Sequence, residues 1–221
     1  MSLTVKNVKH SKIISSNNPN PVLFVDVDDT CLELLGGLVM WLNKLNRLKD
    51  YKPGKIIKDR SNLHDWLNIP EPLMNTWKHE FTTYSWEWGA LNGRADASEA
   101  FKVFRYYGWR VIGVGHGSST VDRAILRRAN LELVYPGVFE DYFIAPGDKS
   151  FSPYMRDYED PICITSVVKY AKDMVDAGHI TFLLKQPWNK EHKDIRIKSF
   201  NNWKQICDNI MANHHKIIKD N

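Results

Sequence analysis

Five short apolar runs, each ending in polar or turn-forming residues, recur along the chain and predict buried β-strands. Their residues are largely β-branched or aromatic, and the runs are nearly continuous. This composition is typical of parallel strands that are covered on both faces. The predicted strands are 22–25, 109–114, 142–145, 161–164 and 180–184.

Between these runs, apolar residues recur three and four positions apart, which is the spacing of an amphipathic helix. The stretch 32–48 shows this spacing most clearly, and Pro53-Gly54 stops it. Further helices are predicted at 62–68, 72–83, 97–107, 121–131 and 167–177, and a last one contains Trp203, Ile206, Cys207 and Ile210.

Strands that alternate with helices predict an α/β fold, a three-layer Rossmann-like core with a parallel sheet and helices on both faces. Residues 1–20 are polar and have the composition of a flexible leader. The sequence shows no internal repeat and no linker between domains. We therefore expect one core, interrupted by the helical stretches that precede the second strand.

The first predicted strand ends in an acidic turn, in which Asp26, Asp28 and Asp29 precede Thr30. Ligands of parallel α/β sheets bind beyond the carboxyl ends of the strands. Asp26 and Asp28 are two positions apart, so both carboxylates can reach one bound group, as a nucleophile and an acid/base partner must. A solvated turn is the simpler alternative. A calcium loop is a weaker one, because the cluster lacks the glycine and the distal glutamate of an EF-hand.

An apolar strand followed by Asp-x-Asp-x-Thr resembles the first motif of the haloacid dehalogenase (HAD) superfamily of phosphatases. The turn 186–189, Gln-Pro-Trp-Asn, is similar to one in the 5′(3′)-deoxyribonucleotidase-like branch, and the resemblance extends over about residues 21–212. It implies a HAD-like core formed by residues 21–33 and 93–221. It also implies that residues 34–92 form a small helical cap over the active site.

The resemblance also implies roles for single residues. Asp26 would attack phosphorus and form an aspartyl-phosphate, while Asp28 would protonate the leaving oxygen and then activate water. The resembled enzymes place a lysine after the third strand to offset negative charge, and Lys149 fits this position. A solvated loop lysine is the alternative.

The second motif departs from the resembled pattern. Where the family has a threonine or serine after the second strand, this chain has Gly115, followed by His116, Gly117 and Ser118. We expect these four residues to form a turn whose backbone N–H groups hold the phosphoryl group. The following Ser119 and Thr120 suit helix capping.

The fourth motif departs further, because Thr165-Ser166 replaces the Asp-Asp pair that completes a Mg²⁺ site in the resembled enzymes. The implied Mg²⁺ ligands are then Asp26, Asp28, Thr165 and Ser166, with Asp29 as a partial substitute for the lost carboxylates. Neutral hydroxyls hold Mg²⁺ more weakly than carboxylates do.

Aromatic residues are dense near the end of the implied cap, at 81–88. A nucleobase stacks well on such rings, so Phe81 and Trp86 are candidate contacts for the substrate. The alternative is that these rings form the core of the cap.

The composition of the chain argues against nucleic-acid binding and against a membrane span. The 221 residues include 43% apolar residues, enough for a sizeable core, and the formal net charge of +4 comes without a dense basic run, so nucleic-acid binding is not expected. No apolar run approaches the roughly 20 residues of a membrane span. Cys31, Cys163 and Cys207 are far apart and mostly in apolar settings, which is typical of reduced thiols in a cytoplasmic protein. The oligomeric state stays open.

These features favour a Mg²⁺-dependent phosphohydrolase that acts on a small phosphate monoester, namely a (deoxy)nucleoside monophosphate. A pseudo-phosphatase, which binds a phosphorylated ligand or a protein partner without turnover, is the alternative from another class. A phosphatase for sugar phosphates shares the same motifs and differs only in the cap.

Overall fold

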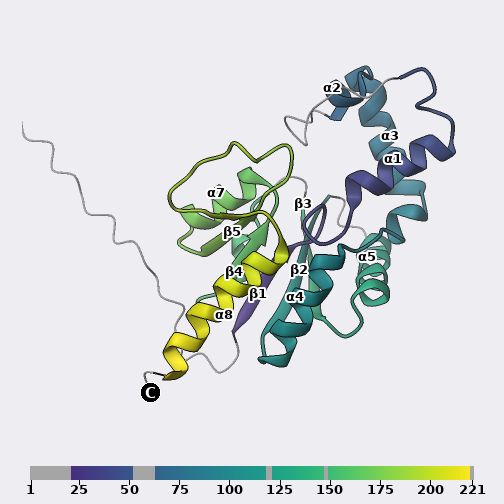
Figure 1. Cartoon of the computed structure of the whole chain (residues 1–221). Coiled ribbons are helices and arrows are strands. Elements are labelled where there is room, and N and C mark those ends of the chain that lie inside the picture. The colour runs from purple at the N-terminus through teal and green to yellow at the C-terminus, as the bar shows by residue number, and fades with distance from the viewer. Residues whose placement is uncertain (1–20, 52–62, 118–120, 147–148, 220–221) are drawn as a thin grey trace, which may run out of the picture.

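A single parallel sheet forms the centre of the molecule (Figure 1). The computed structural model describes residues 21–51, 63–117, 121–146 and 149–219. Within them the strand order is β3-β2-β1-β4-β5-β6, and every pair is parallel. The strands are β1 (Val22–Asp26), β2 (Arg110–Gly117), β3 (Phe139–Pro146), β4 (Ile162–Thr165), β5 (Ile180–Leu184) and β6 (Lys198–Phe200). This confirms the predicted α/β fold.

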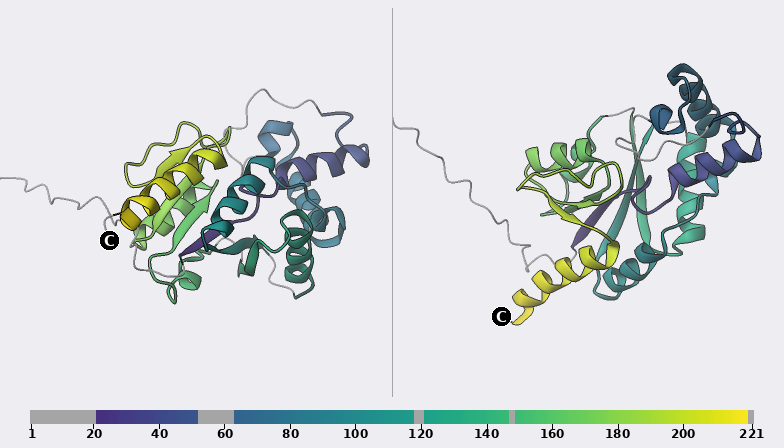
Figure 2. Two further views of the ribbon diagram at one scale, coloured as in Figure 1. Left: turned by 60° about the horizontal axis from the view of Figure 1, so that its bottom comes forward. Right: turned by 45° about the horizontal axis from the view of Figure 1, so that its top comes forward.

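Helices cover both faces of the sheet. On one face, α4 (Ala95–Tyr106), α5 (Val121–Val134) and α8 (Trp203–Lys219) share an apolar cluster with Leu23 and Val25 of β1. Helices α4 and α8 lie side by side there (Figure 2). On the other face, the short α6 (Ser152–Met155) and α7 (Val168–Asp176) pack on Val22 and Phe24. The alternation of side chains along β1 thus separates two apolar layers.

A helical unit lies beyond the carboxyl end of β1 and consists of α1 (Leu34–Lys44), α2 (Leu63–Leu67), α3 (Glu71–Tyr84) and the 3₁₀ turn η2 (Glu87–Gly89) (Figure 1). We call this unit the cap. The chain leaves the core and returns to it side by side, since Leu32 bridges Gly93 and the Glu33 N–H donates to the Asn92 carbonyl at 2.9 Å. The cap therefore joins the core through two adjacent connections.

Three details differ from the sequence-based expectation. Strand β2 continues to Gly117 instead of ending at 114, because its last residues pair with the long β3. Strand β6 was not predicted: it is short, half-exposed and paired only with β5. The loop 151–160 contains α6. The expected leader, 1–20, lies outside the described residues.

Among the residues that the structure describes, no helix combines the length and the apolar character that a membrane crossing requires.

Candidate functional site

The two aspartates of the acidic turn are buried at the carboxyl end of the central strand. Asp26 is the last residue of β1 and is 1% exposed, and Asp28 is 8% exposed. Strand β1 lies between β2 and β4, so the ends of three strands meet at this point. Burial of two carboxylates is costly unless other groups satisfy them. The turn is therefore a built site and not a solvated loop.

A hydroxyl from β4 holds Asp26. The Thr165 Oγ1 donates to Asp26 Oδ2 at 2.7 Å and accepts the Val167 N–H at 3.0 Å. Both residues are buried, and they are neighbours because β1 and β4 pair in register up to Val25 and Ile164. The hydroxyl thus orients one carboxylate oxygen of Asp26.

A hydrogen bond between two hydroxyl groups joins the acidic turn to the end of β4. Thr30 Oγ1 donates to Ser166 Oγ at 3.1 Å and accepts the Ser166 N–H at 2.9 Å. The Ser166 carbonyl in turn accepts from the Asn189 amide at 2.7 Å and from the Trp188 indole at 3.3 Å. The Gln186 amide donates to the Asp29 carbonyl at 3.0 Å. The turn 186–189 therefore fastens both β4 and the acidic turn in place.

Two cysteines, Cys31 and Cys163, lie close to the aspartates and are fully buried in the core. Burial raises the pKa of Cys163 well above its ordinary value, and the negative charge of Asp26 adds to the shift. Burial raises the pKa of Cys31 in the same way, followed by the charges of Asp26 and Asp28. A raised pKa favours the uncharged thiol, which is a poor nucleophile.

The donor set does not fit a Mg²⁺ centre of the expected kind. The hydroxyls of Thr165 and Ser166 are already engaged with Asp26 and Thr30. Asp29 has a positive φ of 57° and accepts the Leu35 N–H at 2.7 Å, so it caps the start of α1. Within the described part of the chain, no group of three or more His, Cys, Asp or Glu side chains could hold a metal ion. Mg²⁺ is usually held by one or two carboxylates and several waters in near-octahedral geometry, and here Thr165 already occupies one oxygen of Asp26 and Arg127 one oxygen of Asp28.

Asp28 has a cationic partner that the sequence did not reveal. Arg127 of α5 is fully buried, and its Nη2 lies 3.1 Å from Asp28 Oδ1. The same guanidinium donates to the Trp88 carbonyl at 3.0 Å and to Asn130 Oδ1 at 3.1 Å, and it stacks 3.8 Å from the centre of the Trp88 ring. The one sequence feature that pointed to Arg127 is the spacing of three polar residues: Arg123, Arg127 and Asn130 recur at helical spacing on one face of the predicted helix.

The expected phosphate turn is extended backbone as far as Gly117. A Cβ built on Gly115 would lie 2.0 Å from the Tyr142 hydroxyl, so a threonine or serine does not fit there. His116 lies on the opposite side of β2 and stacks on Tyr170 of α7, with ring centres 3.7 Å apart. Ser118 lies outside the described residues. Gly115 therefore makes room for Tyr142, and a turn at 115–117 is a wrong prediction.

The remaining described candidates lie on other elements of the chain. Lys149 is exposed just beyond the end of β3. Phe81 is fully buried and packs on Trp41 at 5.4 Å between ring centres, in the core of the cap. Trp86 is 66% exposed, with the Lys44 ammonium 5.4 Å from its ring centre. The structure thus brings Thr165 to Asp26, joins Ser166 to the acidic turn through Thr30, and places Phe81 in the core of the cap.

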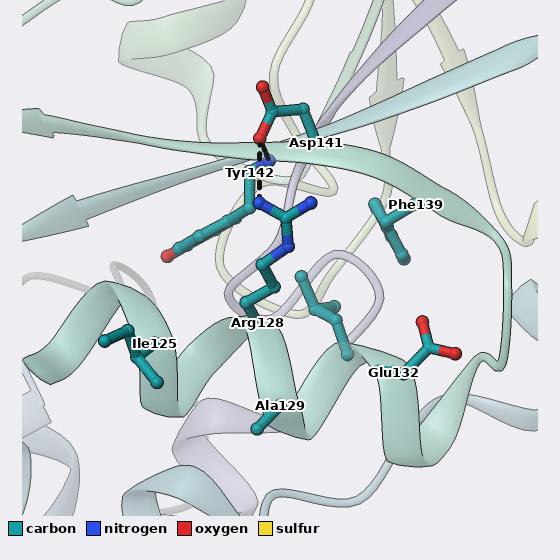
Figure 3. A pocket seen from close by; sticks show the side chains of 8 residues that line it. Ile125, Arg128, Ala129, Glu132, Phe139, Asp141 and Tyr142 are labelled. Atoms are coloured by element: carbon teal, nitrogen blue, oxygen red, sulfur yellow. Dashed lines mark hydrogen bonds and ion pairs between the residues drawn. The ribbon is translucent and has the colours of Figure 1, made fainter.

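A hollow of about 350 Å³ lies elsewhere, on the outer side between α5 and β3 (Figure 3). Arg128 spans it to Asp141 at 3.3 Å, and Tyr142 lines it. Neither Asp26 nor Asp28 is among the residues that line it.

Solved structures similar to this chain include proteins named as HAD hydrolases. A haloacid dehalogenase-like family hydrolase from Xanthomonas campestris is 9% identical, with a TM-score of 0.57 and coverage of 90% of this chain and 98% of that one. CbbY from Rhodobacter sphaeroides in complex with phosphate is 12% identical, with a TM-score of 0.54 and coverage of 84% and 95%. The D,D-heptose 1,7-bisphosphate phosphatase from B. bronchiseptica, complexed with magnesium and phosphate, is 9% identical, with a TM-score of 0.53 and coverage of 87% and 98%.

A scan of family models and a search of the curated proteins found no match. At these identities the structural likeness shows the fold alone. The fold is that of HAD-superfamily hydrolases, and the activity has to be argued from the site.

Proposed function

We propose that this chain is a HAD-type hydrolase that cleaves a phosphate monoester, with Asp26 as the nucleophile. The observation that carries the proposal is the position of Asp26, buried at the carboxyl end of the central strand and oriented by Thr165 at 2.7 Å. Asp28 is two residues further along the same turn, where an acid/base partner is needed. CbbY and the heptose bisphosphate phosphatase, which share the fold, were both solved with phosphate.

The reaction would proceed in two displacements. Asp26 Oδ1 attacks phosphorus, the bond from phosphorus to the leaving oxygen breaks, and that oxygen takes a proton from Asp28, which first takes it up from solvent and returns one to solvent at the end of the cycle. Water then attacks phosphorus and gives a proton to Asp28, the bond from phosphorus to Asp26 breaks, and phosphate leaves. Both carboxyl groups return to their starting state. No step is assigned to a metal, because the donors at Thr165 and Ser166 do not fit one.

Among phosphate monoesters, we propose a (deoxy)nucleoside monophosphate. Two observations support this choice: the Gln-Pro-Trp-Asn turn at 186–189 resembles that of the deoxyribonucleotidase-like branch, and Trp86 offers an exposed ring on the cap. Phe81 has no part in this proposal, because it is enclosed by the cap. Sugar phosphates are the alternative substrates to be tested, since one protein of similar structure is named as a heptose bisphosphate phosphatase.

Binding without turnover is the second candidate, and two contacts favour it. Thr165 occupies one oxygen of Asp26, and Arg127 occupies one oxygen of Asp28. A phosphate dianion beside Asp26 is repelled unless cations offset both charges. In this case the chain would hold a phosphorylated ligand and release it unchanged.

Phosphate release from a panel of nucleoside and sugar monophosphates separates the two candidates. Each assay compares the wild type with Asp26→Asn and with the exposed control Asp65→Asn, in Mg²⁺ and in EDTA. For a hydrolase, Asp26→Asn should lower kcat on the order of a thousandfold or more, as removal of a covalent nucleophile does, and Asp65→Asn should not change it. If no substrate releases phosphate faster than the Asp26→Asn background, the hydrolase proposal is wrong. Turnover that requires Mg²⁺ would contradict the conclusion that these residues do not fit a Mg²⁺ centre.

A further inference from the structure

Two arginines of α5 stack on one buried tryptophan of the cap. Arg123 and Arg127 are one helical turn apart, and their guanidinium carbons lie 4.6 Å and 3.8 Å from the ring centre of Trp88. All three side chains are at least nine-tenths buried: Arg123 is 9% exposed, Arg127 0% and Trp88 6%. Cation–π contact at this distance stabilises a guanidinium and fixes its plane.

The charges in this cluster do not balance. Arg127 pairs with Asp28 at 3.1 Å, but no carboxylate among the described residues lies within ion-pair distance of Arg123. Burial lowers the pKa of Arg123, and the positive charge of Arg127 lowers it further. A guanidinium that is largely covered and has no anionic partner is a favourable place for an anion to bind. The cluster therefore lacks one negative charge.

The position of the cluster shows where that charge can come from. Helix α5 begins where β2 has ended, so its amino end lies at the ligand-binding edge of the sheet. Arg123 is in the first turn of α5, about 6 Å nearer that edge than Arg127. The partially positive amino end of the helix adds to the attraction for an anion. Lys149, the cation expected at this site, is exposed beyond β3.

We propose that Arg123 and Arg127 bind the phosphoryl group of the ligand, and that Arg127 exchanges Asp28 for the phosphate oxygens when the ligand enters. A phosphate dianion supplies the missing charge, and its oxygens match the forked N–H groups of two guanidinium ions. The exchange also releases Asp28 for the proton transfer assigned to it. This inference deepens the proposed function and rests on it only in the choice of a phosphate monoester as ligand.

Calorimetric titration with inorganic phosphate tests the inference without requiring turnover. The proteins compared are the wild type, Arg123→Gln, Arg123→Lys and Arg127→Lys, with Arg128→Gln as the matched control, because Arg128 is on the same helix but is exposed and pairs with Asp141. All titrations are made in EDTA at fixed ionic strength, and circular dichroism verifies that each variant is folded. Arg123→Gln breaks no ion pair among the described residues, so it keeps the test valid if the Arg127 variant does not fold.

We expect the wild type to bind phosphate, Arg123→Gln to raise Kd by about tenfold or more, and Arg128→Gln to leave Kd unchanged. The Kd values of Arg123→Lys and Arg127→Lys should lie between those of the wild type and Arg123→Gln, since lysine keeps the positive charge but lacks the paired N–H groups of a guanidinium. Acetate, which carries a single charge, should bind more weakly than phosphate. Absence of phosphate binding to the wild type, or an unchanged Kd in Arg123→Gln, would overturn the inference. Binding without phosphate release from any ester would support it and contradict the hydrolase proposal instead.

Discussion

At the scale of single residues, one hydroxyl decides the electrostatics of the site. Thr165 lies beside Asp26 where β1 and β4 pair, and its donated hydrogen bond lowers the cost of burying this carboxylate. An aspartate there would set two carboxylates side by side, which repel each other unless a cation lies between them. We therefore expect the identity of this residue to change how strongly this edge of the sheet attracts a metal ion.

Replacement of Thr165 by aspartate should create a Mg²⁺ requirement for stability. Without metal, we expect Thr165→Asp to lower the free energy of unfolding by about 1–3 kcal/mol through repulsion and the lost hydrogen bond. With Mg²⁺ at roughly 100 times its Kd, binding of the ion should raise the free energy of unfolding of this variant by about 2.7 kcal/mol. Urea unfolding with and without Mg²⁺ measures both effects.

Thr165→Asn is the matched control, because it has the shape of aspartate without the charge. It should gain no stability from Mg²⁺, and neither should the wild type. An equal gain in the wild type would show that the natural residues already hold the ion.

At the scale of elements, β2 is shaped by its contact with β3. It continues three residues past Val114, the partner of Asp26, and pairs with β3 as far as Pro146. Gly115 lies in this extension, directly against the Tyr142 hydroxyl. Burial raises the pKa of Tyr142, and the nearby charge of Asp28 raises it further, so the ring stays a neutral phenol at the site. The glycine is required by packing rather than by a turn.

Gly115→Ala should destabilise the protein by about 1–3 kcal/mol, the usual effect of overpacking a well-filled site. The new methyl group would lie 2.0 Å from the Tyr142 hydroxyl and 3.0 Å from the ring carbon that bears it. Tyr142→Phe removes the closer atom, so the double variant should recover part of the loss in urea unfolding. Additive losses in the double variant would mean that the two residues do not compete for this space.

The sequence predicted local features well and distant partners poorly. The strand ending in Asp26 and Asp28 was predictable, because the apolar run and the acidic turn are contiguous. Arg127 was not, since it meets Asp28 only after α5 has packed against the cap, 99 positions away in sequence. The strand β6 was missed for a related reason: its three residues are half-exposed, and pairing with β5, not apolar character, makes them a strand.

At the scale of the molecule, the cap and the core form one apolar unit. Trp41 and Phe81 of the cap belong to the same buried cluster as Phe101 and Trp203 of the core. The Arg127 guanidinium adds a polar connection, since it contacts both Asp28 of the core and Trp88 of the cap. The cap therefore lacks a separate core that could keep it folded by itself.

We expect urea to unfold the whole chain in a single transition. Five of the eight tryptophans lie in the cap, so fluorescence reports mainly on the cap, while far-ultraviolet circular dichroism reports on all helices. Because one apolar cluster spans both parts, the two signals should give the same midpoint and the same slope. A fluorescence midpoint at lower urea would show that the cap unfolds first. The contacts between Arg127, Asp28 and Trp88 would then connect two units of unequal stability, and loosening of the cap would expose the cationic cluster before the core unfolds.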